Sequence, residues 1–289
     1  MYCTQTVAAL LLATTLAAGD FSGTQAMEYV KQIVALGPRT PASPAMKKQQ
    51  AYILAQLKTC GCQVFEDDFT AQTPNGPVGM KNIIARFLGT NGKALVVTGH
   101  YDTKTFPNFR FVGANDAGSS AALLLEMART WKGRSHASDI YLVWLDGEEA
   151  YGEWSATDSL YGSRHLAQKW AIDGTAARIK ALINVDMIGD KDLNIVAEMY
   201  SYEGLRRLVW DVAAQLGRGQ YFTGQEYPIE DDHVPFLKRG VKAIDLIDFS
   251  YGPNHSWWHT ADDTVDKLSP NSFQVVGDVI VETFRRLDP

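Results

Sequence analysis

The sequence has few cysteines. Its 289 residues include three, Cys3, Cys60 and Cys62, an odd number that cannot all pair within one chain. Cys60 and Cys62 are separated by a single residue, a spacing that strains a disulfide and falls short of a full zinc motif. We therefore interpret the three thiols as structural or free.

Positive charge is also scarce. The 27 lysines and arginines are outnumbered by 33 aspartates and glutamates, which gives a net charge of −6 and a pI near 5.5. Such an acidic balance argues against nucleic acid or an anionic membrane as a partner. The sequence contains no apolar run of 18 residues, no internal repeat and no low-complexity tract. We expect a monomer with no nucleic-acid or membrane partner.

The N-terminal segment is apolar but lacks basic residues. The run from Val7 to Ala18 has the length of a signal-peptide core and ends in small residues, yet the first basic residue is Lys31. Residues 1–20 are therefore predicted to be either a signal peptide or an apolar N-terminal segment. We expect an exported protein, periplasmic or secreted, while an intracellular protein with an apolar first helix remains open.

From residue 21 onward, helical and extended patterns alternate. Helical periodicity covers Thr24–Leu36 and Ala45–Leu57, and two extended runs flank Pro74–Pro77 as in a hairpin. Four short apolar runs follow, separated by helical segments: Ala94–Thr98, Ile140–Leu145, Ala181–Val185 and Ala243–Ile247. This alternation predicts a single α/β domain over residues 21–289. Its expected architecture is a three-layer sandwich, with a central, mostly parallel mixed sheet flanked by helices.

The run Ile140–Leu145 ends in Asp146-Gly147-Glu148-Glu149. The run is rich in β-branched and aromatic residues and apolar on both faces, which indicates a buried parallel strand. Ligands bind at the carboxyl ends of such strands, so Glu148 and Glu149 could hold a metal and move a proton. Acidic residues also favour helix N-termini without any catalytic role. This motif alone leaves both interpretations open.

Other potential metal ligands occupy comparable positions. His100 and Asp186 each follow a buried run, Asp116 precedes a helix predicted to extend to about Arg129, and His259 lies in the loop after the last run. A lone aspartate at a strand end is more often structural. Together with the two glutamates, however, this set suits Zn²⁺, which binds nitrogen and carboxylate oxygen and keeps an open position in catalytic sites.

The order and spacing of these motifs resemble the zinc aminopeptidase superfamily. The motifs are His100-Tyr101-Asp102, Asn115-Asp116-Ala117-Gly118, Gly147-Glu148-Glu149, Asp186-Met187-Ile188-Gly189 and Trp258-His259-Thr260. Two further segments, Trp154–Ala167 and Asp231–Gly240, resemble one branch, the glutaminyl-peptide cyclotransferase family. The resemblance runs from about Phe21 to the C-terminus. It implies a zinc aminopeptidase-like fold and an acyltransferase. That enzyme would convert N-terminal glutamine, and more slowly glutamate, of peptides or proteins to pyroglutamate, releasing ammonia or water.

The resemblance also implies roles for individual residues. One zinc ion would be held by Asp116, Glu149 and His259. Glu148 would act as general acid and base, with Asp186 and Asp231 as its hydrogen-bonded supports. Trp154 and Trp258 would form walls of the substrate pocket.

The resemblance gives other histidines weaker roles. His100 corresponds to a metal ligand of two-zinc aminopeptidases but not of the cyclotransferases, so it is a possible second-site residue that Asp102 could orient. We interpret His165 as a packing or capping residue. His233 is expected to fix the loop that carries Asp231.

The sequence also departs from the animal members of the family. These carry a disulfide beside the site, whereas the corresponding positions here are Gly99 and Ala121. The loop Phe249–Trp257 departs as well, which leaves selection of the second and third substrate residues open and indicates a bacterial-type enzyme. Two alternatives are a zinc aminopeptidase, with two metals and an activated water, and a non-catalytic peptide-binding relative. The latter should have lost a ligand, and none is missing.

Overall fold

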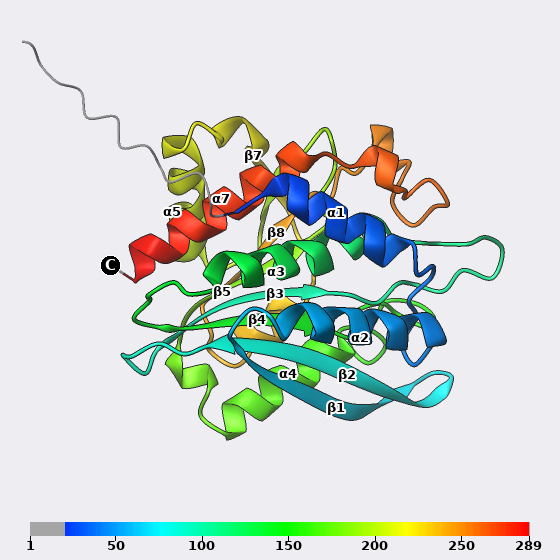
Figure 1. The fold of residues 1–289 in the computed structure, drawn as a ribbon. Helices are drawn as coiled ribbons and strands as arrows, with labels where there is room; N and C mark the ends of the chain where they lie inside the picture. The colour runs from blue at the N-terminus through cyan, green and yellow to red at the C-terminus, as the bar shows by residue number, and fades with distance from the viewer. Residues whose placement is uncertain (1–20, 289) are drawn as a thin grey trace, which may run out of the picture.

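A six-stranded mixed sheet forms the centre of the computed structural model, which describes residues 21–288 (Figure 1). The expectations for residues 1–20, including Cys3 and the signal peptide, lie outside the described residues. The strand order is β1-β2-β4-β3-β5-β8. The four parallel strands are β3 (Ala94–His100), β4 (Asp139–Leu145), β5 (Ile179–Asp186) and β8 (Ala243–Ile247). The predicted mixed, mostly parallel sheet is confirmed.

The hairpin of β1 (Gln63–Thr73) and β2 (Gly76–Phe87) extends this sheet, with β2 antiparallel to β4. The strand β2 begins within the segment Pro74–Pro77 that was expected to separate the two strands. Thr73 pairs with Gly76, so only Pro74 and Asn75 form the turn. Gly76 has a φ of 98°, a left-handed conformation that glycine adopts without steric cost.

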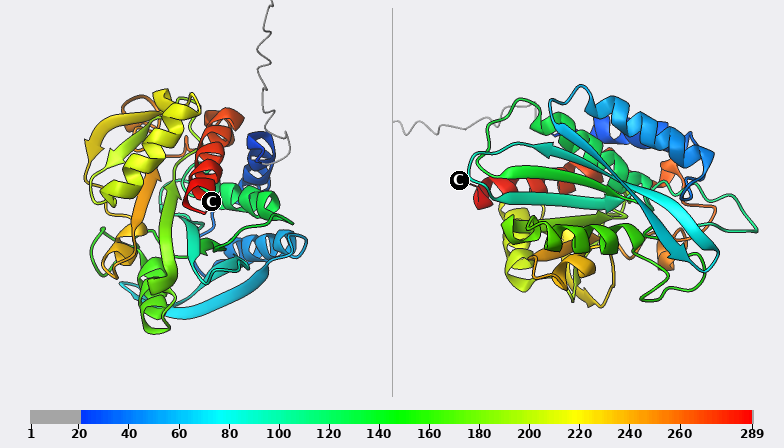
Figure 2. Two further views of the ribbon diagram at one scale, coloured as in Figure 1. Left: turned by 90° about the vertical axis from the view of Figure 1, so that its left-hand side faces the viewer. Right: turned by 90° about the horizontal axis from the view of Figure 1, so that it is seen from below.

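Helices cover both faces of the sheet (Figure 2). One face carries α1 (Gly23–Val34), α2 (Pro44–Leu57), α3 (Gly118–Trp131) and α7 (Pro270–Leu287). The opposite face carries α4 (Tyr161–Ile172) and the short α6 (His233–Leu237). Short 3₁₀ helices complete the connections, namely η1 (Ala176–Arg178), η2 (Gly219–Tyr221), η3 (Pro253–His255) and η4 (Val265–Lys267). The expected three layers are therefore present.

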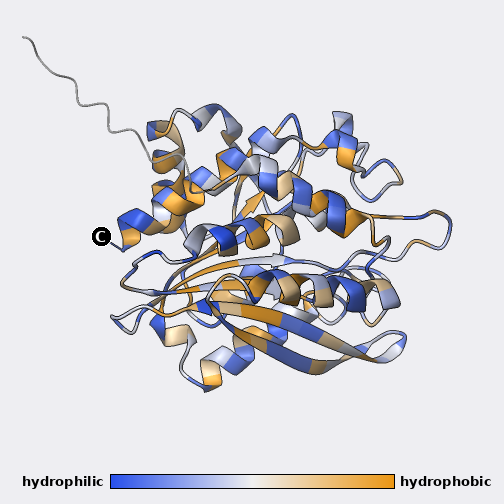
Figure 3. Ribbon diagram, viewed as in Figure 1, coloured by the Kyte–Doolittle hydropathy of each residue, from blue (hydrophilic) through white to orange (hydrophobic). Residues whose placement is uncertain are grey.

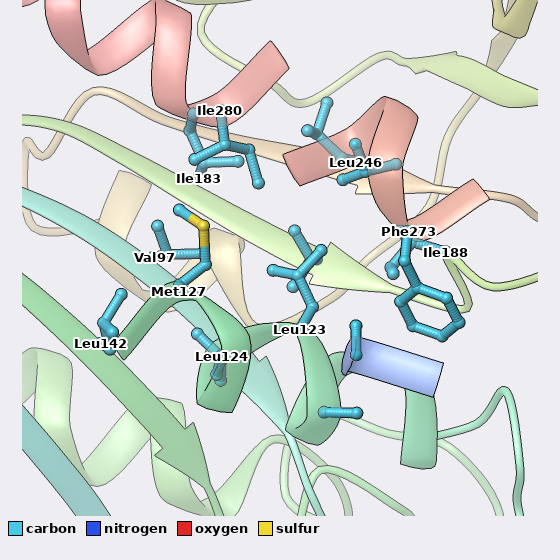
Figure 4. Close-up of a cluster of buried hydrophobic side chains, with 14 of the residues drawn as sticks. Val97, Leu123, Leu124, Met127, Leu142, Ile183, Ile188, Leu246, Phe273 and Ile280 are labelled. Atoms are coloured by element: carbon cyan, nitrogen blue, oxygen red, sulfur yellow. The ribbon is translucent and has the colours of Figure 1, made fainter. Parts of the chain in front are cut away.

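Alternating strand residues build the two cores. In β3, Leu95 and Val97 belong to the larger core beneath α3, whereas Ala94 and Val96 belong to the core beneath α4. In Figure 4 the α3 side chains Leu123 and Met127 lie among the apolar side chains of the larger core. Apolar colour in Figure 3 is concentrated on the central strands. Burial of each such side chain stabilises the fold by roughly 1.5–3 kcal/mol.

Several helices begin at residues that cap their free N–H groups. The Oγ of Ser22 accepts from the backbone N–H of Gln25 at the start of α1, and Ser43 does the same for Met46 in α2. Proline follows Ser43 at the first helical position, where its missing N–H has no cost. Among the described residues, no helix combines the length and the apolarity needed to cross a membrane.

A second, two-stranded parallel sheet was not predicted. It consists of β6 (Ile195–Glu198) and β7 (Phe222–Tyr227), and α5 (Glu203–Gln215) lies between them in the sequence. β6 has only four residues, too few to show the alternation of apolar and polar residues that is typical of a strand. β7 has a glycine and exposed polar residues along much of its length. This unit carries the chain toward the segment that contains Asp231.

Candidate active site

The candidate residues converge because parallel strands end at the same sheet edge. His100 is the last residue of β3 and Asp186 the last of β5, while Glu148 and Glu149 follow β4 within four residues. Asp102 follows His100 by two residues. Its carboxylate accepts from the backbone N–H groups of Glu148, at 3.1 Å, and of Glu149, at 3.4 Å, which fixes the glutamate pair.

Asp116, Glu149 and His259 form one cluster that could hold a metal ion. The His259 Nε2 atom lies 3.2 Å from Asp116 Oδ2 and 3.1 Å from Glu149 Oε1. Burial lowers the pKa of His259, but the neighbouring Asp116 and Glu149 carboxylates outweigh this and raise it to about 10. One imidazole nitrogen and two carboxylate oxygens, converging at a pocket floor, match the donor set of a catalytic zinc site.

His100, Asp116 and Asp186 form a second cluster. His100 Nε2 lies 3.2 Å from Asp116 Oδ1 and 3.1 Å from Asp186 Oδ1. Asp116 thus belongs to both clusters and turns a different oxygen toward each histidine. Burial of Asp186 raises the pKa of its carboxyl to about 7. The prediction that Asp102 orients His100 is less well supported, because His100 Nδ1 is 3.5 Å from Asp102 and has no hydrogen-bond partner among the described residues.

A carboxylate that the sequence analysis missed holds the segment around Asp116. The oxygens of Asp263 accept from the backbone N–H groups of Asn115, at 2.8 Å, and Asp116, at 3.1 Å. The Tyr251 hydroxyl donates to Asp263 Oδ1 at 2.8 Å. Asp263 lies only four residues after His259, so its place in the Thr260-Ala261-Asp262-Asp263 sequence was the available signal.

Arg39 fastens both ends of the loop that leads to Asp116. Its buried guanidinium donates to the carbonyl oxygens of Val112, at 2.6 Å, and Gly113, at 2.8 Å. Its backbone N–H donates to Thr103 Oγ1 at 2.8 Å. The residues between these attachment points include Lys104 and Phe106, which the sequence analysis did not select.

Aromatic rings surround His259. The indole of Trp258 stacks on the imidazole at a centroid distance of 4.3 Å, and Phe106 and Phe111 present their edges at 5.5 and 5.9 Å. The run Phe106-Pro107-Asn108-Phe109-Arg110-Phe111 was the sequence signal for this cluster. These contacts restrict rotation of the imidazole.

Glu148 is buried beside the proposed ligands. Burial raises the pKa of its carboxyl well above the ordinary range; the charge of His100 opposes this, while Glu149 and Asp231 add to it. A raised pKa brings the carboxyl closer to the pH range in which a general acid and base works. Asp186 and Asp231, the proposed supports of Glu148, have different partners. Asp186 contacts His100, and Asp231 accepts a hydrogen bond from Asn184 Nδ2 at 3.0 Å.

Asn184 links Asp231 to the interior of the sheet. Its Nδ2 also donates to Asp245 Oδ1 at 3.1 Å, and its Oδ1 accepts from the Thr98 hydroxyl at 2.7 Å. On the other side, His233 Nε2 lies 3.0 Å from Glu198 at the end of β6. His233 therefore fixes the Asp231 segment in the structure, whereas His165 packs on Phe69 away from the site, with centroids 4.4 Å apart.

A pocket of about 510 Å³ opens over these groups. Its lining includes both predicted tryptophans, Trp154 and Trp258, which are 42% and 36% exposed. Lys104 also lines it, and the Nζ atom donates to Glu149 Oε2 and to the Ala150 carbonyl, both at 3.2 Å. The pocket thus joins a buried, carboxylate-rich floor to an aromatic mouth.

Comparison with known proteins gives consistent results. Residues 82–284 match the model of peptidase family M28. The chain is 34% identical over 270 residues to a Bos taurus glutaminyl-peptide cyclotransferase-like protein, covering 80% of this chain and 67% of that protein. It matches the crystal structure of an Acidobacteriales bacterium glutaminyl cyclase with a TM-score of 0.90 and 40% identity, covering 99% of both chains. A Zn-dependent exopeptidase from Parabacteroides distasonis matches with a TM-score of 0.82 and 26% identity, covering 93% of this chain and 99% of that one.

Proposed function

Because this chain belongs to peptidase family M28 and, within it, to the glutaminyl-peptide cyclotransferases, we propose that it cyclises N-terminal glutamine of peptides or proteins. The product is pyroglutamate and the leaving group is ammonia; N-terminal glutamate reacts more slowly and loses water. The observation that carries this proposal is the position of Glu148 beside the Asp116, Glu149 and His259 cluster, at the floor of a pocket walled by Trp154 and Trp258.

The proposed cofactor is one zinc ion. Asp116, Glu149 and His259 would hold it, and a zinc ion with three protein ligands could take a substrate atom as its fourth. Zinc bound there would polarise the γ-carboxamide carbonyl of the substrate and stabilise the negative charge that develops on its oxygen.

Glu148 moves the protons in this proposal. The α-amine nitrogen attacks the side-chain carbonyl carbon, and Glu148 takes a proton from that nitrogen as the new C–N bond forms. The same carboxyl then gives a proton to the departing nitrogen, which leaves as ammonia when the old C–N bond breaks. Since nucleophile and electrophile belong to one residue, the pocket has mainly to fold the side chain back on itself. The apolar faces of Trp154 and Trp258 suit this small, neutral group.

A zinc aminopeptidase is the second candidate. The observation that favours it is the cluster of His100, Asp116 and Asp186, which provides ligands for a second metal ion next to the first. A peptidase would use an activated water and anchor the α-amine, whereas the cyclisation requires that amine to be free. The wall formed by Trp154, Trp258 and the Asp231 segment favours the cyclisation.

One pair of assays separates the two candidates. We expect the zinc-loaded enzyme to release ammonia from Gln-initiated peptides and glutamine amides, and to leave leucine amides and leucine nitroanilides intact. Metal analysis of the same sample should give one zinc ion per chain. Release of free amino acids from varied N-termini, without pyroglutamate from glutamine substrates, would establish the peptidase instead.

We further infer that residues 21–289 act as one catalytic domain, in monomeric form. The apolar run Val7–Ala18 supports export of the protein to the periplasm or the medium. The partners are then free N-termini of peptides or proteins that begin with glutamine or glutamate.

A further inference from the structure

The pocket has a buried floor and an exposed mouth with different compositions. The floor contains the proposed ligands and Glu148, all buried or nearly so. The mouth contains the exposed Glu153, Trp154, Pro228, Glu230 and the partly exposed Trp258. Two carboxylates thus lie at the entrance, on segments that approach the pocket from different parts of the chain.

Both segments are held in place by hydrogen bonds. The Asp158 carboxylate accepts from the backbone N–H groups of Tyr151 and Gly152, at 2.9 and 2.8 Å, immediately before Glu153. The backbone N–H of Ile229 donates to the buried Glu198 at 3.3 Å, immediately before Glu230. The two carboxylates therefore extend from a fixed backbone.

Among the described residues, positive charge near these two carboxylates is confined to the side of Glu230. Lys104 is the one lysine or arginine among the pocket-lining residues of the described chain, and its ammonium group is bound to Glu149 and the Ala150 carbonyl. Glu230 pairs at 3.2 Å with Lys238, whose side chain is 67% exposed. It also lines an adjacent surface pocket with Lys238, Arg164 and Arg239, so its charge is partly compensated. Glu153 makes no ion pair within the part of the chain that the structure describes.

We propose that Glu153 and Glu230 make the enzyme select substrates with a lysine or arginine at the second or third position and disfavour acidic residues there. This inference rests on the proposed cyclotransferase function. The reacting glutamine must occupy the floor, beside Glu148, so the rest of the peptide leaves through the mouth, between the segments that carry Glu153 and Glu230. The exposed face of Trp154 can also contact a cationic side chain favourably.

The size of the effect follows from Coulomb's law. In water at moderate salt, exposed carboxylates act on a substrate charge mainly within a Debye length of about 8–10 Å, so they attract a cation and repel an anion weakly. The combined preference for lysine over glutamate is on the order of tenfold in kcat/KM. It decreases with salt because such charges are exposed to solvent.

Three matched peptide amides test the inference on the zinc-loaded enzyme: Gln-Lys-Ala, Gln-Ala-Ala and Gln-Glu-Ala. We expect kcat/KM for ammonia release to decrease in that order. The ratio of the first peptide to the third is compared within each variant, so that changes in overall activity cancel. The variants are Glu153→Gln, Glu230→Gln and the double substitution, each measured at low salt and at about 0.5 M salt.

The ratio should fall in each single variant and approach one in the double variant, and high salt should also reduce it in the unmodified enzyme. The control is Glu203→Gln on α5, which removes the same charge from a side chain that is 64% exposed and outside the pocket, and should leave the ratio unchanged. A ratio near one in the unmodified enzyme, or an unchanged ratio in the double variant, overturns the inference while the cyclotransferase function stands. Failure to release ammonia even from Gln-Ala-Ala amide overturns both.

Discussion

The indole ring of Trp258 lies against the imidazole of His259, with ring centroids 4.3 Å apart and 19° between the ring planes. One contact therefore joins a wall of the proposed substrate pocket to a proposed metal ligand. Because Phe106 and Phe111 contact the same imidazole by their edges, its orientation does not depend on Trp258 alone.

Replacement of Trp258 by alanine should open the wall without releasing the metal. We expect kcat/KM for cyclisation to fall by about one order of magnitude, the scale of an aromatic contact. Zinc content should be unchanged. Trp258→Phe, which keeps an aromatic face, should recover much of the activity. Loss of zinc from Trp258→Ala would show that the stack, rather than the phenylalanine edges, holds His259.

Replacement of His259 by alanine should remove zinc and activity together. It deletes one of three proposed protein ligands, and neither carboxylate can supply the missing nitrogen. Zinc would be measured by elemental analysis after dialysis, with circular dichroism as the check on folding. His136→Ala is the matched control, because His136 contacts the Ser138 carbonyl, outside the pocket lining. Full zinc content in a folded His259→Ala protein would rule out this ligand set.

Replacement of Glu148 by glutamine should separate proton transfer from metal binding. The amide keeps the shape of the side chain but cannot shuttle a proton, so turnover should fall by roughly two to four orders of magnitude. Zinc content should match that of the unmodified enzyme. Near-normal turnover would mean that another group carries the proton.

Reducing agent should leave the thermal stability of the protein unchanged. Cys60 and Cys62 are both free thiols, and burial raises the pKa of each. Thermal unfolding with and without dithiothreitol tests this expectation. A drop in Tm of more than a few degrees on reduction would reveal a disulfide, within or between chains.

The stability of the fold should fall in acid partly through Asp67. Burial opposes ionisation of this carboxyl, but contacts with His165, Lys169 and Asn82 outweigh it and lower its pKa from 3.8 to about 2. Because the folded-state pKa is the lower one, the stabilisation is present above about pH 4 and is lost as the pH falls toward 2.

Urea unfolding from pH 2 to pH 7 measures this dependence. Asp67→Asn should flatten the fall in the free energy of unfolding between about pH 4 and pH 2. Asp68→Asn, at a side chain that is 71% exposed, is the control and should keep the original slope. An unchanged slope in Asp67→Asn would assign the acid sensitivity to other carboxyls.

The sequence was sufficient where local pattern determines the structure. Buried strands such as Ile140–Leu145 are recognisable from composition, and their carboxyl ends must meet, so Glu149 and Asp186 could be located before any coordinates. Asp263 was missed although it follows His259 by four residues, because its role is to accept hydrogen bonds from Asn115 and Asp116, nearly 150 residues away. The contact of Asp102 with the backbone N–H of Glu148 was missed for a similar reason, because the sequence does not show which backbone N–H groups a carboxylate will bind.

Because Arg39 is attached to both ends of the loop after β3, substitutions at the base of this loop should affect the enzyme differently from substitutions farther along it. Thr103, Val112 and Gly113 are held, so the path of the chain into Asp116 is set at the base of the loop. Residues 105–110 lie beyond those attachments. Phe106 is the exception among them, because its ring contacts the His259 imidazole. Elsewhere in this stretch the chain can vary in sequence or length beside the pocket, while the held ends keep the path of the backbone into Asp116.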